Sequence, residues 1–194
     1  AATLPKYQVA CGVTDILMHT LDRYFNPVST NETSDALAEA LLRVVLKNGP
    51  KVYANPADLQ AMGEIMWCGS LSHNGLTGLG GKKDFAVHQL GHALSAKYDV
   101  AHGAGLAVIM PAWMEFVYKH NVTRFAQMAV RIWDCEMNFE NPEETALRGI
   151  YSFRRFLHEI GMPINFDELG AKEADIPVLV EKFGLGDGMT GGFV

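Results

Sequence analysis

Apolar residues recur at intervals of three or four along most of the chain, which is the spacing of amphipathic helices. The first such run covers about residues 7–25, and Asn26-Pro27 ends it. Its apolar positions are Val13, Leu17, Leu21 and Tyr24. Hardly any segment shows the alternation of apolar and polar residues that a half-buried strand requires. The pattern therefore predicts an all-α fold, a compact helical bundle.

Similar runs predict further helices within the segments 29–50, 61–73, 85–98, 103–120 and 141–163. We expect Gly49-Pro50 to stop the second helix, because proline removes a backbone hydrogen bond from a helix interior. The glycine-rich segment 75–83 is predicted to be a loop. The segment 103–120 is apolar on nearly every face, so its helix is expected at the centre of the bundle. Short helical or irregular pieces should finish the chain.

Composition adds limits to this picture. With 194 residues, 48% of them hydrophobic, the chain can bury the core of a single domain covering residues 1–194. The balance of 16 basic and 22 acidic residues argues against nucleic acid or an anionic membrane surface as a partner. No signal peptide and no run of about 18 apolar residues is visible. The three widely spaced cysteines also favour a reduced, cytoplasmic protein over a disulfide-linked one.

Three histidines fall within fifteen positions of the segment 85–103. His88 and His92 are four apart, on a helix face that does not carry the main apolar stripe. Taken alone, such a pair is explained equally well by two histidines that face water or cap a neighbouring carbonyl and by two metal ligands. His102, however, begins the next predicted helix, where a tight reversal after Tyr98 would bring it back toward His88. Two imidazoles from consecutive helices form part of a metal site, since neutral imidazole is a common metal ligand.

A second pair completes a candidate ligand set. Asp15 and His19 are also four apart, opposite the apolar face of the first helix, where a solvated polar face is the simpler interpretation for this pair alone. Asp15, His19, His88 and His102 together would suit Fe(II), Zn(II) or Mn(II). Because no thiolate is included, a closed structural zinc site is not expected. An open coordination position would allow Lewis-acid chemistry.

The motifs resemble the helical C-terminal domain of the iron-containing alcohol dehydrogenases, most of all the NADH-dependent butanol dehydrogenase branch. The segment GVTDILMHTLDRYF carries Asp-x-x-x-His, and GKKDFAVHQLGHALSAKYDVAHGAGLAVIMPAWMEF carries His-x-x-x-His with a third histidine fourteen residues after the first. The likeness covers nearly the whole chain, including GEIMWCGSLSHNGL and EKFGLGDGMTGGF. It implies a dehydroquinate synthase-like helical fold.

By position, the resemblance implies metal ligation by Asp15, His19, His88 and His102, and a catalytic role for His92 beside the metal. It also implies iron as the metal, NAD(P)H as the cofactor, and hydride transfer between a short-chain aldehyde and a primary alcohol. His92 would relay a proton between the substrate oxygen and solvent or the cofactor ribose.

Members of this family begin with an α/β nucleotide-binding domain, and no Gly-rich phosphate turn such as GxGxxG occurs in this sequence. We therefore expect the chain to be a fragment that lacks this domain and a last helix, that has little or no activity alone, and that leaves its cofactor-binding residues unknown. Apolar surface left uncovered would favour a homo-oligomer, most simply a dimer.

Other histidines and other functions are less favoured. His73, His120 and His158 lie near predicted helix ends, where partly exposed histidines are ordinary. A helical metal-dependent hydrolase of the His-Asp phosphohydrolase type is one alternative, although the sequence has no adjacent His-Asp pair. A non-catalytic helical module that holds a structural ion, or none, is the other.

Overall fold

The computed structural model of the chain describes residues 2–26, 31–82 and 84–183, and within these ranges it contains helices and no strand. In chain order the α-helices are α1 (Lys6–Tyr24), α2 (Glu32–Ala54), α3 (Leu59–His73), α4 (Ala86–Tyr98), α5 (His102–Val117), α6 (Val122–Trp133), α7 (Pro142–Glu159), α8 (Phe166–Leu169) and α9 (Ile176–Phe183). Short 3-10 helices are η1 (Leu76–Gly78), η2 (Tyr118–Asn121) and η3 (Glu173–Asp175). The prediction of an all-α bundle is confirmed.

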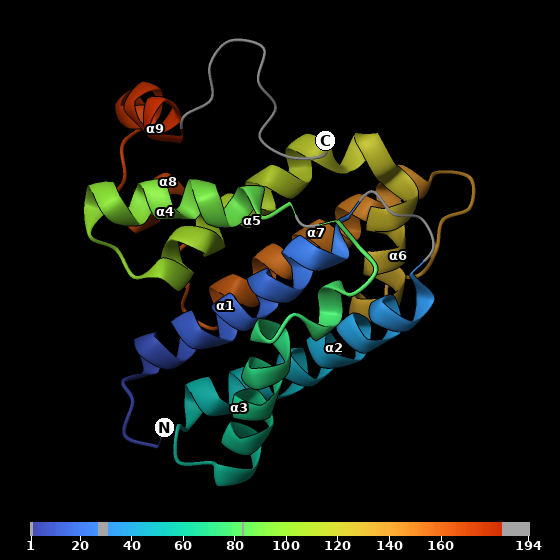
Figure 1. Cartoon of the computed structure of the whole chain (residues 1–194), viewed down its shortest axis with the longest axis horizontal. Helices are drawn as coiled ribbons and strands as arrows, with labels where there is room; N and C mark the ends of the chain where they lie inside the picture. The colour runs from blue at the N-terminus through green and yellow to red at the C-terminus, as the bar shows by residue number, and fades with distance from the viewer. Residues whose placement is uncertain (1, 27–30, 83, 184–194) are drawn as a thin grey trace.

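Helix α1 runs through the middle of the molecule, with α4 and α5 on one side and α2 and α3 on the other (Figure 1). Its predicted apolar face is the centre of the core. Val13, Leu17, Leu21 and Tyr24 are each 3% exposed or less. The polar face of the same helix therefore points away from the core, toward the ends of α3, α4 and α5.

Two glycines let α5 approach its neighbours closely. A Cβ atom on Gly103 would lie 2.4 Å from the backbone oxygen of Cys11 in α1. A Cβ atom on Gly91 of α4 would lie 2.7 Å from Cδ2 of Leu106. The backbone of Cys11 cannot move aside, so glycine is required at position 103, whereas a larger residue at position 91 would force the end of the Leu106 side chain to shift. The first contact fixes the start of α5, and with it His102, against α1.

The predicted helix stop at Gly49-Pro50 is wrong, because α2 continues through Pro50 to Ala54. A proline inside a helix costs about 3 kcal/mol. Packing of the last turns offsets this cost: Val52 is fully buried, and Gly49 packs against Val13 and Phe156. Tertiary burial thus outweighs the local helix breaker.

Two further differences concern the middle of the chain. Helix α5 ends at Val117 rather than at residue 120, and the 3-10 helix η2 follows it. Helix α6 was not among the predicted segments, although it is strongly amphipathic and packs along α7. Within segment 75–83, the structure has only the short η1 and turns in its described residues, as predicted.

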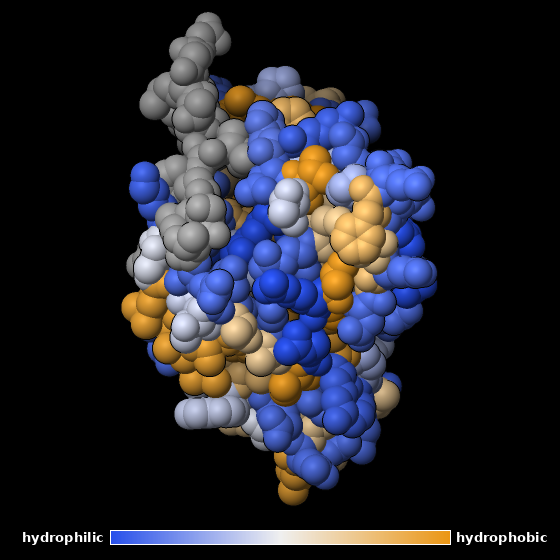
Figure 2. Space-filling model, turned by 90° about the vertical axis from the view of Figure 1, so that its right-hand side faces the viewer, coloured by the Kyte–Doolittle hydropathy of each residue, from blue (hydrophilic) through white to orange (hydrophobic). Residues whose placement is uncertain are grey.

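The most apolar helix is buried in the protein, as the sequence predicts. In α5, Leu106, Ala107, Met110 and Met114 are fully buried. None of the helices in the described ranges is long and apolar enough to cross a membrane. Hydrophilic residues cover most of the face shown in Figure 2, and hydrophobic residues gather in smaller patches between them.

Candidate metal centre

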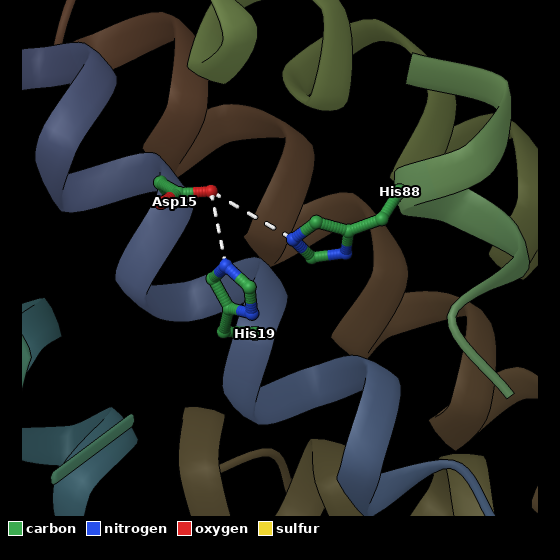
Figure 3. Close-up of side chains that lie close together, drawn as sticks. All are labelled: Asp15, His19 and His88. Carbon is green, nitrogen blue, oxygen red and sulfur yellow. Dashed lines mark ion pairs between the residues drawn. The ribbon is translucent and has the colours of Figure 1, made fainter. Parts of the chain in front are cut away.

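One carboxylate oxygen of α1 faces three imidazoles that come from three helices. Oδ1 of Asp15 lies 3.7 Å from Nε2 of His19, which is one turn further along α1. The same oxygen lies 3.7 Å from Nε2 of His88 in α4 and 3.6 Å from Nε2 of His102 in α5. Figure 3 shows the side chains of His19, from α1, and His88, from α4, pointing toward Asp15. Ligand atoms of Asp15, His19 and His88 all lie within 4.8 Å of one another, whereas His102 lies close to Asp15 but outside that group.

The distances from Oδ1 of Asp15 to the three imidazole nitrogens are close to those between ligands of one metal ion. They are too long for hydrogen bonds, which place the heavy atoms of such pairs about 2.7–3.2 Å apart. Ligand atoms about 2.0–2.2 Å from one ion lie about 3.3–3.6 Å from one another at tetrahedral angles. Moreover, Asp15 Oδ1 and His88 Nε2 are buried without a hydrogen-bond partner in the structure. Unpartnered buried polar atoms are costly, so a cation bound between them would fit this donor set.

A buried carboxylate orients the His88 ring. Nδ1 of His88 donates a hydrogen bond to Oδ2 of Asp22 across 2.5 Å, and Asp22 is only 3% exposed. This bond leaves Nε2 directed at Asp15. Histidines that bind metals commonly donate their other ring nitrogen in this way. Asp22 follows Asp15 by seven residues and His19 by three, so this helical spacing was a signal in the sequence that our prediction did not use.

Protonation in the cluster is strongly perturbed. Burial alone would raise the pKa of the Asp15 carboxyl, but the imidazoles of His88 and His19 more than offset this and lower the pKa to about 2. Burial, followed by the charge of His88, lowers the pKa of His19 to about 4. Burial also lowers the pKa of His102. At neutral pH, these groups therefore hold the ionised carboxylate and neutral imidazoles that metal ligands require.

His88 behaves differently from the other imidazoles. Burial alone would lower its pKa, but its interactions with Asp15 and Asp22 raise the pKa to about 9. Burial raises the pKa of Asp22 itself. The two carboxylates thus favour the protonated form of His88, and a cation bound at Nε2 would compete with that proton.

His92 lies at the edge of the cluster. Its ring stacks on the ring of His102, with the ring centres 5.0 Å apart and the planes inclined by 24°. Its side chain is exposed, one helical turn beyond the buried His88. The structure therefore places His92 beside the candidate ligands and open to solvent.

Phe85 covers the cluster on another side. It precedes α4 in the left-handed backbone conformation, with φ of 61°, which is uncommon for a residue other than glycine. Its ring centre lies 5.8 Å from that of His19 and 5.1 Å from that of His88. Such strained backbone is found most often at functional sites. Here it holds an apolar ring against two imidazoles.

His73 is a partly exposed histidine at a helix end, as expected, but the sequence did not place it beside Asp15. It is the last residue of α3, and its side chain is 42% exposed. However, its Nε2 lies 3.1 Å from Oδ2 of Asp15, and its ring centre lies 4.0 Å from that of His19. His120 and His158, with which it was grouped, are exposed on η2 and α7. His73 therefore belongs to the cluster.

Known proteins resemble this chain over most of its length. The profile of the Fe-containing alcohol dehydrogenase family, C-terminal, matches residues 9–186. NADH-dependent butanol dehydrogenase A of Clostridium acetobutylicum is 33% identical over 181 residues, which cover 93% of this chain and 46% of that protein. The NADPH-dependent aldehyde reductase YqhD of Escherichia coli is 31% identical over 180 residues, with coverage of 93% and 46%. The chain thus spans about half the length of these relatives.

Solved structures show the same fold. The substrate- and cofactor-free aldehyde reductase YqhD of Escherichia coli superposes with a TM-score of 0.90 at 30% identity, over 95% of this chain and 48% of that one. NADH-dependent butanol dehydrogenase A of Thermotoga maritima superposes with a TM-score of 0.89 at 36% identity, over 94% and 45%. The chain belongs to the Fe-containing alcohol dehydrogenase family and corresponds to its helical C-terminal domain.

Proposed function

We propose that this chain is the metal-binding part of an NAD(P)H-linked alcohol dehydrogenase or aldehyde reductase. Its ligands would be Asp15, His19, His88 and His102, and its substrates short-chain aldehydes and primary alcohols. The observation that carries the proposal is the position of one oxygen of Asp15 between three imidazole nitrogens, at 3.6–3.7 Å. The names of the relatives, butanol dehydrogenases and an aldehyde reductase, support the substrate class.

The donor set favours a divalent ion of borderline hardness. One carboxylate and three imidazoles suit Fe(II), and they also suit Zn(II) or Mn(II). Such an ion would supply Lewis acidity, which draws electron density from a carbonyl oxygen and favours negative charge on that oxygen. The carboxylate of Asp15 contributes one negative charge to the ion, and Asp22 holds His88 in the tautomer that binds through Nε2.

His92 is proposed to move the proton that the reaction needs. Reduction of an aldehyde adds a hydride to carbon and a proton to oxygen, so the alcohol product requires a proton donor. His92 touches the ring of His102 and is exposed, which allows exchange of its proton with water. The ring of Phe85, on the other side of the cluster, would keep water from His19 and His88.

The test is a coupled measurement of metal content and hydride transfer. The complete gene product that contains this chain would be loaded with Fe(II) and assayed with butanal and either NADH or NADPH. We expect cofactor oxidation in the wild type, its loss together with the metal in His88→Ala, and neither effect in His120→Ala. Metal binding without cofactor oxidation would contradict the catalytic part of the proposal. Release of phosphate from phosphate esters in its place would favour a hydrolase.

A further inference from the structure

His73 connects the end of α3 to the carboxylate of Asp15. Its Nδ1 lies 2.7 Å from the hydroxyl oxygen of Ser72 and 2.9 Å from the backbone oxygen of Gly69. Its Nε2 lies 3.1 Å from Oδ2 of Asp15. Both ring nitrogens thus have partners, so the orientation of the ring is fixed although the side chain is partly exposed.

The two oxygens of Asp15 therefore have different surroundings. Oδ1 faces the Nε2 atoms of three imidazoles and has no hydrogen-bond partner in the structure. Oδ2 faces His73 at hydrogen-bond distance. A carboxylate that is free to rotate would offer either oxygen, or both, to an ion. The contact with His73 makes the two oxygens of Asp15 different, because it engages Oδ2 and leaves Oδ1 unpaired.

We propose that His73 is a positioning residue of the metal centre: its Nε2–H donates to Oδ2 of Asp15, so that Oδ1 alone binds the ion. The inference rests on the metal centre put forward under Proposed function. It gives Asp15 an outer partner, as Asp22 is the outer partner of His88. Outer partners of this kind orient the ligands and adjust their affinity for the metal.

The surroundings of His73 favour this role. The guanidinium of Arg23 in α1 donates a hydrogen bond to the backbone oxygen of Ser72. It donates another to the backbone oxygen of His19, across 2.8 Å. The guanidinium of Arg23 thus ties the end of α3 to the turn of α1 that carries the candidate ligands. Oδ2 of Asp15 and the backbone oxygen of Gly69 can only accept, so the His73 ring meets them as a donor, through Nε2–H and Nδ1–H respectively.

The arrangement has a consequence for the reaction. A carboxylate that binds through one oxygen uses one coordination position, whereas a bidentate carboxylate uses two. By holding Oδ2, His73 would leave one position of the ion open for the oxygen of an aldehyde or alcohol. Without His73, Oδ2 would be free to turn toward the ion and occupy that position.

Cobalt(II) is a suitable probe, since its visible absorption depends on coordination number. The full chain would be prepared as wild type, His73→Ala, His73→Gln and His120→Ala, with helix content checked by circular dichroism. The dissociation constant for cobalt(II) would be measured by competition with a chelator, and the visible spectrum recorded. Paramagnetic proton NMR would count bound imidazoles through their shifted N–H signals.

For His73→Ala we expect affinity for cobalt(II) to fall about 10- to 100-fold, with a changed visible spectrum. His73→Gln should recover most of both properties, because the glutamine amide can donate to Oδ2 in place of the imidazole. His120→Ala, an exposed histidine on η2, should match the wild type, and the NMR spectrum of the wild type should contain three bound imidazoles.

Several results would overturn the inference. Unchanged affinity and spectrum in His73→Ala, or no recovery in His73→Gln, would show that the hydrogen bond to Oδ2 does not position Asp15. Four bound imidazoles in the wild type, reduced to three in His73→Gln, would make His73 a ligand instead. If the wild type binds no cobalt(II), the metal centre itself is wrong and the inference fails with it, which distinguishes the two failures.

Discussion

Asp22 accepts a hydrogen bond from Nδ1 of His88 across 2.5 Å, and both side chains are buried. The two residues come from different helices, α1 and α4, and are 66 positions apart in the chain. The bond holds the His88 ring so that its other nitrogen points at Asp15, 3.7 Å away. Asp22, which is not one of the proposed ligands, thus orients His88, which is.

Replacing Asp22 by asparagine should weaken metal binding while preserving the shape of the side chain. The amide accepts a weaker hydrogen bond than the carboxylate and removes the negative charge beside His88. We expect the affinity for Zn(II) to fall about 10- to 100-fold, as measured by competition with a chelator. Asp167→Asn, an exposed residue of α8, is the matched control. Equal affinities in the two variants would contradict the role of Asp22.

Adding a methyl group at Gly103 should separate α5 from α1. The new Cβ would lie 2.4 Å from the backbone oxygen of Cys11, which cannot move aside as a flexible side chain can. Since His102 precedes this position, its distance from Asp15 should increase. We therefore expect Gly103→Ala to lower both the unfolding midpoint in urea and the affinity for Zn(II).

Gly12→Ala is the control for this substitution. Gly12 is an exposed residue in the same region of α1, and a Cβ there would have no atom within 4 Å. Alanine in a helix interior is more stable than glycine by about 0.5–1 kcal/mol. The control should therefore keep its metal affinity and gain a little stability. A Gly103→Ala variant as stable and as tightly metal-bound as Gly12→Ala would contradict the packing argument.

Replacing His92 should separate metal binding from catalysis. In the complete gene product, we expect His92→Ala to keep the metal affinity of the wild type, because His92 is not one of the four proposed ligands. The rate of aldehyde reduction should fall about 10²- to 10⁴-fold, the usual effect of losing a proton-transfer group. Single-turnover measurement of NADH oxidation gives this rate. Loss of the metal in His92→Ala would reject the division of roles.

Truncation of Leu106 tests the packing of α4 against α5. Leu106 is fully buried and its Cδ2 lies against Gly91. Leu106→Ala should lower the free energy of unfolding by about 2–5 kcal/mol, measured by urea denaturation. Leu59→Ala, at a position that is 75% exposed, should change it by no more than about 0.5 kcal/mol. Similar losses in both variants would be inconsistent with this core.

Much of the fold and most of the cluster could be predicted from local patterns. The apolar spacing of α1 identified its buried face, and the four-residue spacing of Asp15 and His19 put both on the other face. The break after Tyr98 gave the reversal that returns His102 toward α1. These features depend on residues close together in the sequence, so helix periodicity was sufficient.

Contacts between distant segments could not be predicted in this way. No histidine, cysteine or carboxylate lies three or four positions from His73 in the sequence, and its place beside Asp15, 58 positions away, depends on how α3 packs on α1. Pro50 was interpreted as a stop because its local effect is unfavourable, whereas the burial of Val52 comes from tertiary packing. Asp22 was a different case, because its spacing from Asp15 and His19 was visible but not used.

The central claim is that Asp15, His19, His88 and His102 bind one divalent ion. The most direct measurement is the metal content per chain, determined by mass spectrometry after loading with Fe(II) and dialysis, for the wild type and Asp15→Asn. We predict one tightly bound ion per chain in the wild type and little or none in the variant. A wild type that retains no ion, or a variant that retains as much as the wild type, would contradict the claim.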